Sequence, residues 1–325
     1  MSAAASALRV RVARKAQEAE GICSLELTSV DGAALPPFSA GSHVDVHLGG
    51  GVVRQYSLCN DPAETHRYLI AVLRDPASRG GSAAVHDAVK EGDELQISAP
   101  KNHFALAHEA RHSLLLAGGI GVTPILCMAE RLAVMGASFD LHYAARSRER
   151  AAFVQRIQGA AFADRAQFHF DDGPEAQRLD LAALLAQPQP GTHLYVCGPK
   201  GFMDAVLSSA RAAGWGEQQL HWEFFSAGAE AAPRTGDEAF EVQLASSGRV
   251  ITVAPDRTVT QALAEAGVEV LVSCEQGVCG TCLTRVLQGT PDHRDVYLTP
   301  EEQAANDQFT PCCSRAKSAR LVLDL

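Results

Sequence analysis

Several features are missing from this sequence of 325 residues, and each absence narrows what the protein can be. No stretch approaches the roughly 18 uninterrupted apolar residues that a membrane-spanning helix needs, so we expect no membrane span. Positive charge is in deficit, since the formal net charge is −10 at pH 7. This charge disfavours a nucleic-acid or anionic-membrane partner. Residues 1–10 contain no basic segment leading into a long apolar run, so we expect no secretory signal and a cytoplasmic location.

The nine cysteines are unevenly distributed, and they carry no sign of a disulfide framework. Cys23, Cys59, Cys127 and Cys197 are scattered singly, which suits a reducing compartment. The chain is also far longer than the short, cysteine-dense scaffolds that depend on disulfides. The other five cysteines all lie between residues 274 and 313.

Three of these five cysteines, Cys274, Cys279 and Cys282, follow the spacing C-x4-C-x2-C. After 29 intervening residues the adjacent pair Cys312 and Cys313 supplies a fourth thiol. Four thiolates at this spacing are the ligand set of a plant-type [2Fe–2S] cluster. A zinc site would more often show two separated C-x2-C pairs. The spacing alone leaves the choice between the last two cysteines open.

Glycines within the cysteine loop fit the same interpretation. An anionic cluster needs backbone N–H groups aimed at its sulfurs when no cationic side chain is near. Gly277 and Gly280 allow a positive φ and a close approach of the backbone to inorganic sulfur.

The remaining chain divides into parts of different periodicity. Residues 8–100 contain short β-branched or alternating runs and a single helical stretch, which predicts a small antiparallel β-barrel. Beyond residue 110, apolar strands alternate with helical segments, which predicts an α/β domain with a parallel sheet. Residues 226–238 are small and polar without a period, as in a linker. We therefore expect the domains 1–108 and 109–226, a linker at 227–236, and a cysteine-bearing domain at 237–325.

The run Arg54-Gln55-Tyr56-Ser57 stands out in the first domain. A guanidinium, an aromatic ring and a hydroxyl at one strand end suit a flat heterocycle that bears a phosphate. An exposed strand of mixed polarity is the alternative interpretation. Downstream, Arg79 precedes Gly80, Gly81 and Ser82 at a predicted helix start, where free N–H groups favour a phosphate. There the alternative is a glycine turn with Ser82 as N-cap.

In the second domain, the apolar strand 114–117 runs into a glycine turn made of Gly118, Gly119 and Gly121. Thr123 is then the expected N-cap of a helix with Pro124 at its first position. The glycines let a pyrophosphate approach the backbone, although the run is not the dinucleotide fingerprint G-x-G-x-x-G.

A second turn, Cys197-Gly198-Pro199, ends a later strand at the same carboxyl edge of the sheet, where ligands bind. Cys197 can also be read as a small core residue. At the end of another strand, Arg146 and Arg148 suit either a 2′-phosphate or a solvated turn.

Five motifs follow one another along the chain: residues 54–57, 80–82, 118–124 and 197–199, and then the cysteine spacing. Together they resemble the motifs of the phthalate dioxygenase reductase family, within the ferredoxin–NADP reductase superfamily. The resemblance covers nearly the whole chain and implies an FMN-binding β-barrel, an NAD-binding α/β domain and a C-terminal α+β ferredoxin domain of the β-grasp type. It implies that NADH, FMN and a [2Fe–2S] cluster are the cofactors, and Arg146 and Arg148 leave NADPH as the alternative to NADH. The implied cluster ligands are Cys274, Cys279, Cys282 and Cys312.

The same resemblance implies roles for individual residues. The implied FMN-binding residues are Arg54, Gln55, Tyr56, Ser57, Gly80, Gly81 and Ser82, together with Phe225 near the flavin. The implied NADH-binding residues are Gly119, Gly121, Thr123, Cys197, Gly198 and Pro199. Ser57, Thr123 and Cys197 are the implied catalytic residues at the flavin and the nicotinamide.

The activity implied by the resemblance is an NADH-dependent reductase component of a two-component Rieske-type aromatic oxygenase. We expect a monomer that forms a transient electron-transfer complex with its oxygenase. A redox-sensing or electron-carrier protein and a reductase for a haem or di-iron acceptor are the alternatives. Residues 237–325 carry 13 acidic and 7 basic residues, which suits either a docking face for a basic partner or an ordinary solvated surface.

Overall fold

The computed structural model describes residues 7–76, 80–225, 236–272 and 274–325. The chain divides into two compact units, Met1–Glu223 and Phe224–Leu325, and each is described by itself. The first unit holds an antiparallel and a parallel sheet, and the second holds a mixed sheet. The predicted fold class is therefore confirmed. The predicted linker 227–236 lies outside the described residues except for Gly236.

Seven antiparallel strands form the first sheet in the order β4-β3-β6-β1-β2-β5, with β7 paired to β3. An isolated bridge joins Leu58 to Ile70, and the Cys59 N–H donates to the Leu69 carbonyl at 2.9 Å. The first and last strands of the order therefore meet, and the sheet closes as a barrel. The elements are β1 (Leu8–Ala19), β2 (Ile22–Ser29), β3 (Ser42–His47), β4 (Val53–Ser57), β5 (Tyr68–Leu73), α1 (Gly81–Asp87), β6 (Glu94–Ile97) and β7 (Lys101–Asn102).

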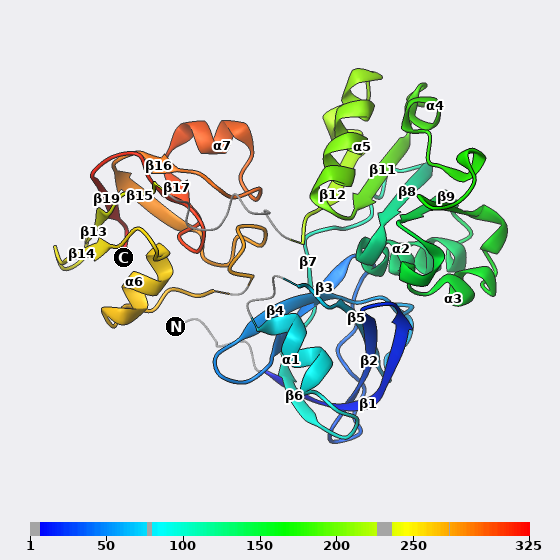
Figure 1. Cartoon of the computed structure of the whole chain (residues 1–325), viewed down its shortest axis with the longest axis horizontal. Coiled ribbons are helices and arrows are strands. Elements are labelled where there is room, and N and C mark those ends of the chain that lie inside the picture. The colour runs from blue at the N-terminus through cyan, green and yellow to red at the C-terminus, as the bar shows by residue number, and fades with distance from the viewer. Residues whose placement is uncertain (1–6, 77–79, 226–235, 273) are drawn as a thin grey trace. The chain divides into compact units, whose positions relative to one another are not determined.

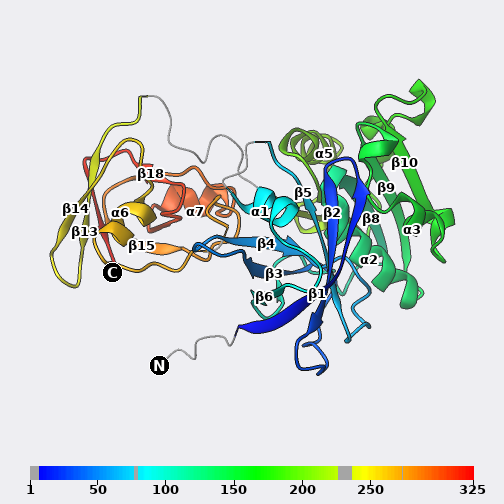
Figure 2. The same cartoon turned by 60° about the horizontal axis from the view of Figure 1, so that its bottom comes forward.

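Alternation along the strands places the barrel core. Val10 and Val12 of β1, Leu25 of β2, and Val44 and Val46 of β3 are fully buried and belong to one apolar cluster. β1, with 12 residues, and β2, with 8 residues, are the longest strands of the barrel and form a hairpin (Figure 2). The β-branched run at residues 8–12 is only the start of β1, which continues to residue 19 because residues 10–19 pair with β2 across two bulges.

The second sheet of this unit is entirely parallel, in the order β10-β9-β8-β11-β12 (Figure 1). The strand order reverses between β8 and β11, so the carboxyl ends of these two strands flank a topological switch point. The strands are β8 (His112–Gly118), β9 (Ser138–Ala145), β10 (Ala166–Phe170), β11 (Thr192–Cys197) and β12 (Leu220–Glu223).

The connections of the parallel sheet contain four helices, α2 (Val122–Val134), α3 (Val154–Gln158), α4 (Leu181–Leu185) and α5 (Lys200–Ala212). Short 3₁₀ helices are η1 (Gly119–Gly121), η2 (Arg148–Arg150), η3 (Ala163–Arg165), η4 (Glu175–Gln177) and η5 (Glu217–Gln219). One of the helical segments expected beyond residue 110 spans residues 149–158, and only its second half forms an α-helix. Phe153 takes a left-handed φ of 62°, which separates η2 from α3.

The second unit contains a five-stranded sheet in the order β14-β13-β19-β15-β17. β19 runs parallel to β13 and antiparallel to β15, so the sheet is mixed. Val242, Leu263 and Phe309 are fully buried in its core. The elements are β13 (Phe240–Leu244), β14 (Val250–Val253), α6 (Val259–Glu265), β15 (Thr284–Gln288), β16 (Pro291–Asp292), α7 (Pro300–Ala305), β17 (Gln308–Phe309), β18 (Arg315–Ala316) and β19 (Arg320–Leu323).

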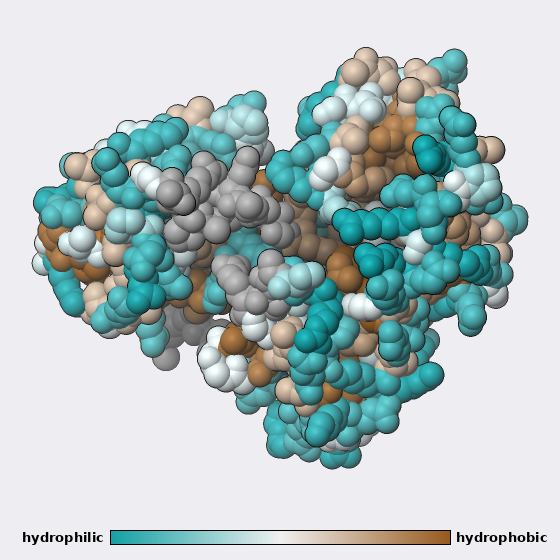
Figure 3. All heavy atoms as spheres, viewed as in Figure 1, coloured by the Kyte–Doolittle hydropathy of each residue, from teal (hydrophilic) through white to brown (hydrophobic). Residues whose placement is uncertain are grey.

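The surface is mainly hydrophilic on the face shown in Figure 3, with apolar residues in separate patches. Among the described residues, no helix combines the length and the apolar character that crossing a membrane requires.

Candidate redox sites

The end of β4 carries the polar run predicted to hold a flavin. Arg54 and Tyr56 share one face of the strand, and Gln55 and Ser57 share the other. The Gln55 Nε2 donates to the Asp45 Oδ1 at 3.1 Å on the neighbouring strand. Burial raises the pKa of the Tyr56 phenol, so this hydroxyl stays neutral and can donate a hydrogen bond to a ligand.

The side chain of Arg54 lies across Gly81, at the start of α1. A Cβ at position 81 would come within 2.6 Å of the Arg54 Cγ and 2.8 Å of its Nε. Glycine at position 81 therefore lets the Arg54 side chain lie beside the first turn of α1 in this conformation, and a larger residue would displace it. A cationic fork next to helix N–H groups fits the phosphate of FMN.

The start of α1 contradicts the alternative in which Ser82 is the N-cap of this helix. Gly80 is the N-cap of α1 with a φ of 91°, so the alternative that makes Ser82 the N-cap is wrong. Ser82 lies inside the helix, and its Oγ accepts a hydrogen bond from the Asp75 N–H at 3.1 Å. A φ of this size favours glycine, which explains why the cap lies two residues before Ser82. Arg79 lies outside the described residues.

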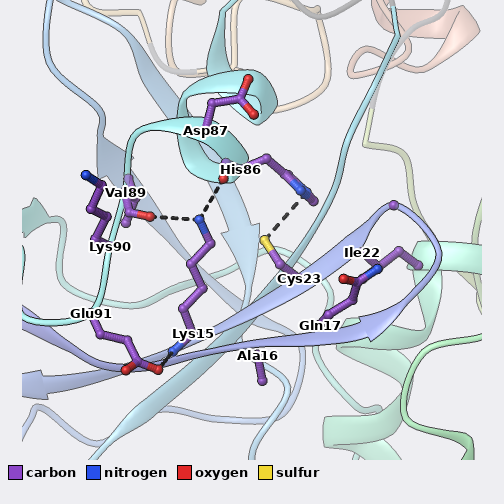
Figure 4. A pocket seen from close by; sticks show the side chains of 11 residues that line it. Lys15, Ala16, Gln17, Ile22, Cys23, His86, Asp87, Val89, Lys90 and Glu91 are labelled. Atoms are coloured by element: carbon purple, nitrogen blue, oxygen red, sulfur yellow. Dashed lines mark hydrogen bonds between the residues drawn. The ribbon is translucent and has the colours of Figure 1, made fainter.

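The opposite end of α1 is held by Lys15 of β1 (Figure 4). The Lys15 Nζ donates to the carbonyl oxygens of Val85, His86 and Val89 at 2.8, 2.8 and 2.7 Å. The last carbonyls of a helix have no partner within it, and a cation there also complements the helix dipole. The contacts border a cavity of about 680 Å³ between the β1–β2 hairpin and α1. Both ends of α1 are therefore tied to strands of the barrel.

The two glycine motifs of the parallel sheet meet at its switch point. A Cβ at Gly121 would lie 2.2 Å from the Cys197 carbonyl oxygen, and one at Gly198 would lie 2.9 Å from the Gly118 Cα. The turn after β8 and the turn after β11 are thus in backbone contact, which requires glycine in both. This edge of a parallel sheet is where a dinucleotide binds.

Aromatic packing supports the same turns. Pro199 is the N-cap of α5, and Phe202 follows in its first turn. The Phe202 ring would lie 2.7 Å from a Cβ at Gly118 and 2.8 Å from one at Gly198. Phe202 is absent from the predicted site, because an aromatic residue in a helix gives no sign of lying against two distant glycines.

Thr123 does not cap α2, contrary to the prediction. The helix begins at Val122 with Gly121 as its N-cap, directly after η1. The Thr123 Oγ1 is buried and donates to the Ile120 carbonyl at 3.1 Å. The prediction is wrong because η1 tightens the chain into the helix and gives the hydroxyl a carbonyl partner instead of a capping role.

Ser57 and Cys197 come together around a residue that the sequence analysis missed, Glu223 at the end of β12. Cys197 and Glu223 are paired across β11 and β12, and the Glu223 Oε2 lies 3.4 Å from the Ser57 Oγ. Burial raises the pKa of Glu223 to about 7, and the hydrogen bond from Ser57 lowers it in part. Burial and the negative charge of Glu223 hold the pKa of the Cys197 thiol well above its ordinary value.

Ser57, Cys197 and Glu223 link the end of β4 in the barrel to the carboxyl ends of β11 and β12 in the parallel sheet. Ser57 is buried, the Cys197 thiol stays protonated, and Glu223 changes its charge near neutral pH. Such residues can donate hydrogen bonds to a flavin ring and border a nicotinamide without supplying a strong base. The only signal for Glu223 in the sequence is one acidic residue within the apolar run 220–225. Phe225 follows β12 and is half-buried in the second unit.

All five cysteines of the second unit are buried. The Cys274 thiol interacts with those of Cys279 and Cys312, and the Cys312 thiol also interacts with that of Cys282. Two iron atoms of a [2Fe–2S] cluster need four thiolates in all, and these contacts join the four thiols into one connected group. Among the described residues, which leave out Ser273, no trio of His, Cys, Asp or Glu side chains is arranged to hold a single metal ion.

The loop around these thiols fits a cluster. Gly277 and Gly280 have φ of 71° and 66°, as a tightly wrapped loop requires. The Gln276 N–H points at the Cys274 Sγ at 3.3 Å, and the Thr281 Oγ1 lies 3.2 Å from the Cys279 Sγ. The Gln276 N–H donor suits an anionic sulfur of a [2Fe–2S] centre, and the Thr281 hydroxyl, which accepts from the protonated Cys279 thiol, can donate to a Cys279 thiolate.

Cys313 differs from its neighbour Cys312. Its Sγ lies 3.3 Å from the Thr310 Oγ1 and would be 2.5 Å from a Cβ at Gly277. Among the cysteine thiols it interacts with that of Cys312, whereas Cys312 also reaches two cysteines of the loop. The contacts favour Cys312 as the fourth ligand.

Comparison with known proteins gives matches along nearly the whole chain. Residues 242–317 match the 2Fe-2S iron-sulfur cluster binding domain, and residues 97–220 match the N-terminal domain of dimethylamine monooxygenase subunit DmmA-like proteins. Vanillate O-demethylase oxidoreductase of Pseudomonas putida is 60% identical over 317 residues, which cover 97% of this chain and 98% of that protein.

Two solved structures extend the comparison. Phthalate dioxygenase reductase is 39% identical with a TM-score of 0.80, and the match covers 98% of both chains. An intact type IV self-sufficient cytochrome P450 monooxygenase is 38% identical with a TM-score of 0.79, covering 98% of this chain and 41% of that one.

Proposed function

The chain belongs to the phthalate dioxygenase reductase family, and we propose that it is the NADH-dependent reductase component of a Rieske-type aromatic oxygenase or demethylase. When bound, FMN links the two-electron chemistry of a nicotinamide to the one-electron chemistry of a [2Fe–2S] cluster. The domain bounds 1–108, 109–226 and 237–325, the monomeric state, the transient complex and the cytoplasmic location are parts of this proposal.

The observation that carries the proposal is the contact between Ser57 and Glu223. It brings the end of β4 in the barrel to the ends of β11 and β12 in the parallel sheet, with Oγ and Oε2 3.4 Å apart. A flavin bound at the end of β4 and a nicotinamide bound at the ends of β11 and β12 would lie next to each other here. Hydride transfer requires positioning and no general base, and the group at this junction is suited to positioning.

We assign the binding roles residue by residue. Arg54, Gly80, Gly81 and Ser82 bind the FMN phosphate, while Gln55, Tyr56 and Ser57 bind the ring, with Phe225 beside it. The residues that bind NADH are Gly119, Gly121, Thr123, Cys197, Gly198 and Pro199. The cluster ligands are Cys274, Cys279, Cys282 and Cys312.

An anaerobic titration tests the proposal. The purified protein is mixed with NADH in steps while its absorption spectrum is recorded, and iron, sulfide and FMN are quantified. We expect bleaching of both flavin and cluster absorption at a stoichiometry of NADH that matches three electron equivalents per chain, two for the flavin and one for the cluster. A protein that binds neither iron nor flavin after anaerobic reconstitution would contradict the proposal.

A haem acceptor is the second candidate, because the self-sufficient cytochrome P450 is nearly as similar in structure as phthalate dioxygenase reductase. The two candidates differ in the protein that receives the electrons. Product formation with purified Rieske oxygenases and with P450 haem domains, each supplied with NADH and this protein, separates them.

A further inference from the structure

Two arginines are buried in the second unit. The side chains of Arg294 and Arg315 are only 6% and 4% exposed. Removing a guanidinium from water is costly unless carboxylates and carbonyls satisfy its donors. Their partners therefore show what the two side chains hold together.

Asp237 is the main partner of Arg294. It pairs with the Arg294 guanidinium in a fork, with Nη1–Oδ2 and Nη2–Oδ1 distances of 2.8 and 2.6 Å, and it is itself only 9% exposed. The Arg294 Nε donates to the Asp292 Oδ2 at 2.8 Å. The fork fixes both the distance and the plane of the pair.

Arg315 approaches Asp237 from another segment. Its Nε lies 3.5 Å from the Asp237 Oδ2, and its other nitrogens donate to the carbonyls of Arg257, Glu238 and Ala254 at 2.6, 3.0 and 3.2 Å. Two positive and two negative side chains, counting Asp292, make the group neutral overall. Three segments, around residues 237, 292–294 and 315, thus converge on one carboxylate.

The residues that directly follow Arg294 contact the cysteine loop at Gly277. Next to Arg294, Asp295 lies against Gly277, whose Cβ would be 2.9 Å from the Asp295 Cα. The Val296 N–H donates to the Gly277 carbonyl at 3.0 Å.

The segment after the cysteine pair makes a second route to the same loop. Ser314, between Cys313 and Arg315, accepts the Arg294 N–H at 3.1 Å and donates to the Asp295 Oδ1 at 3.3 Å. Cys313 itself lies against Gly277. Displacing either arginine would therefore move backbone that contacts the predicted cluster loop.

We propose that Asp237 is a positioning residue for the iron–sulfur centre, and that its ion pairs with Arg294 and Arg315 fix the loop at Gly277 and the segment that carries Cys312. The inference rests on the proposed cluster ligands. A buried ion pair adds little net stability compared with apolar packing but specifies one geometry, which fits a role in positioning. Asp237 also directly follows the predicted linker 227–236, so the end of that linker is fixed where the cluster segment is fixed.

The test compares Asp237→Asn with the wild-type holoprotein. The substitution keeps the shape but leaves two buried guanidiniums with one carboxylate fewer. We expect shifted g-values in the electron paramagnetic resonance spectrum of the reduced cluster and a shifted midpoint potential. Cluster loss, followed by visible absorption, should become about tenfold faster or more, as a buried unpaired charge predicts. FMN content and NADH-dependent flavin reduction should stay unchanged.

Asp307→Asn is the matched control, since this aspartate of the same unit is exposed. A wild-type spectrum and potential in Asp237→Asn would overturn the inference, even with a lower melting temperature, because Asp237 would then only anchor the fold. If Asp237→Asn does not accumulate, Arg294→Lys keeps the charge but lacks the fork. It should shift the spectrum in the same way, and an unchanged spectrum would equally refute the role.

The failure of this inference differs from the failure of the proposed function. A wild-type protein that binds no iron contradicts the cluster itself. A wild-type protein with a normal cluster, together with an unaltered cluster in both variants, contradicts only the positioning role.

Discussion

Glu223 places a carboxyl group of variable charge next to the hydroxyl of Ser57. Burial raises its pKa from 4.5 to about 7, so the group is half-protonated near neutral pH. We expect the rate of flavin reduction by NADH to change with an inflection near pH 7, measured by stopped-flow absorbance. Glu223→Gln should remove the inflection and slow reduction about three- to tenfold, the effect of one altered hydrogen bond. Retention of the inflection would exclude Glu223 as its source.

The raised pKa of Glu223 also makes the free energy of unfolding depend on pH. Its folded pKa lies above its unfolded pKa, so the unfolded chain releases this proton first as pH rises. The stabilisation that the protonated group contributes is complete below pH 4.5 and is lost as pH rises through 7. In Glu223→Gln this loss should disappear from denaturant unfolding curves, whereas the exposed control Glu175→Gln should keep it.

Cys312 and Cys313 offer a direct residue-level comparison. Cys312→Ala should abolish the visible absorption of the cluster and the reduction of one-electron acceptors, while NADH still reduces FMN. Cys313→Ala should retain the cluster, because its thiol lies against Thr310 and Gly277 instead of the loop cysteines. An intact spectrum in Cys312→Ala would transfer the ligand role to Cys313.

The residues that the sequence predicts are those that belong to motifs. Cys274, Gly81 and Gly121 stand in short runs whose spacing has a chemical meaning: the two glycines lie in close contacts, and Cys274 is buried beside other thiols. Glu223 was missed because it acts through Ser57, 166 positions away, and a lone acidic residue in a strand has no spacing to read. Asp237 escaped for the same reason, since its partners lie far along the chain.

At the level of elements, α1 is held at one end by Lys15 and carries the proposed phosphate site at the other. Lys15→Met removes the ammonium but keeps the length of the side chain. We expect the affinity for FMN, measured by fluorescence quenching, to fall about tenfold, as expected for the loss of charged contacts to the helix end. Affinity for riboflavin, which lacks the phosphate, should not change.

Riboflavin is the decisive comparison for this helix. If Lys15→Met weakens the binding of riboflavin as much as the binding of FMN, the lysine stabilises the barrel in general and does not act on the phosphate end of α1. Lys90→Met is the control, because Lys90 borders the same cavity with an exposed side chain. It should leave both affinities at their wild-type values.

Element bounds follow from the sequence where periodicity is strong and fail where tertiary contacts decide. The strand predicted to end at Cys197 appears as β11, since the run from Leu194 to Cys197 is apolar throughout. The two-residue strands β16 and β18 are too short to show a period, and their pairing sets Asp292 opposite the buried Arg315. The predicted start of α2 is wrong because η1 leads directly into the helix and the Thr123 hydroxyl donates to the Ile120 carbonyl, which the capping pattern does not reveal.

On the scale of the molecule, the unequal distribution of charge predicts how the protein meets its acceptor. Net charge is −10 over the whole chain, and residues 237–325 carry 13 acidic against 7 basic residues. An acceptor with a basic face would be steered by this charge, and added salt would screen the attraction over a Debye length of about 10 Å at 0.1 M. We expect electron delivery to the oxygenase to slow severalfold between low and physiological salt, measured as product formation at limiting oxygenase.

Two comparisons isolate the docking step in that measurement. Oxidation of saturating NADH with dissolved oxygen as the neutral acceptor should vary little with salt, because no charged partner is involved. Glu269→Gln, which removes an exposed charge five residues before Cys274, should flatten the salt dependence, whereas Glu175→Gln in the other unit should not. Delivery that rises with salt would mean that apolar contacts dominate, and the exposed Leu271 beside the cysteine loop, 81% accessible, would become the residue to replace.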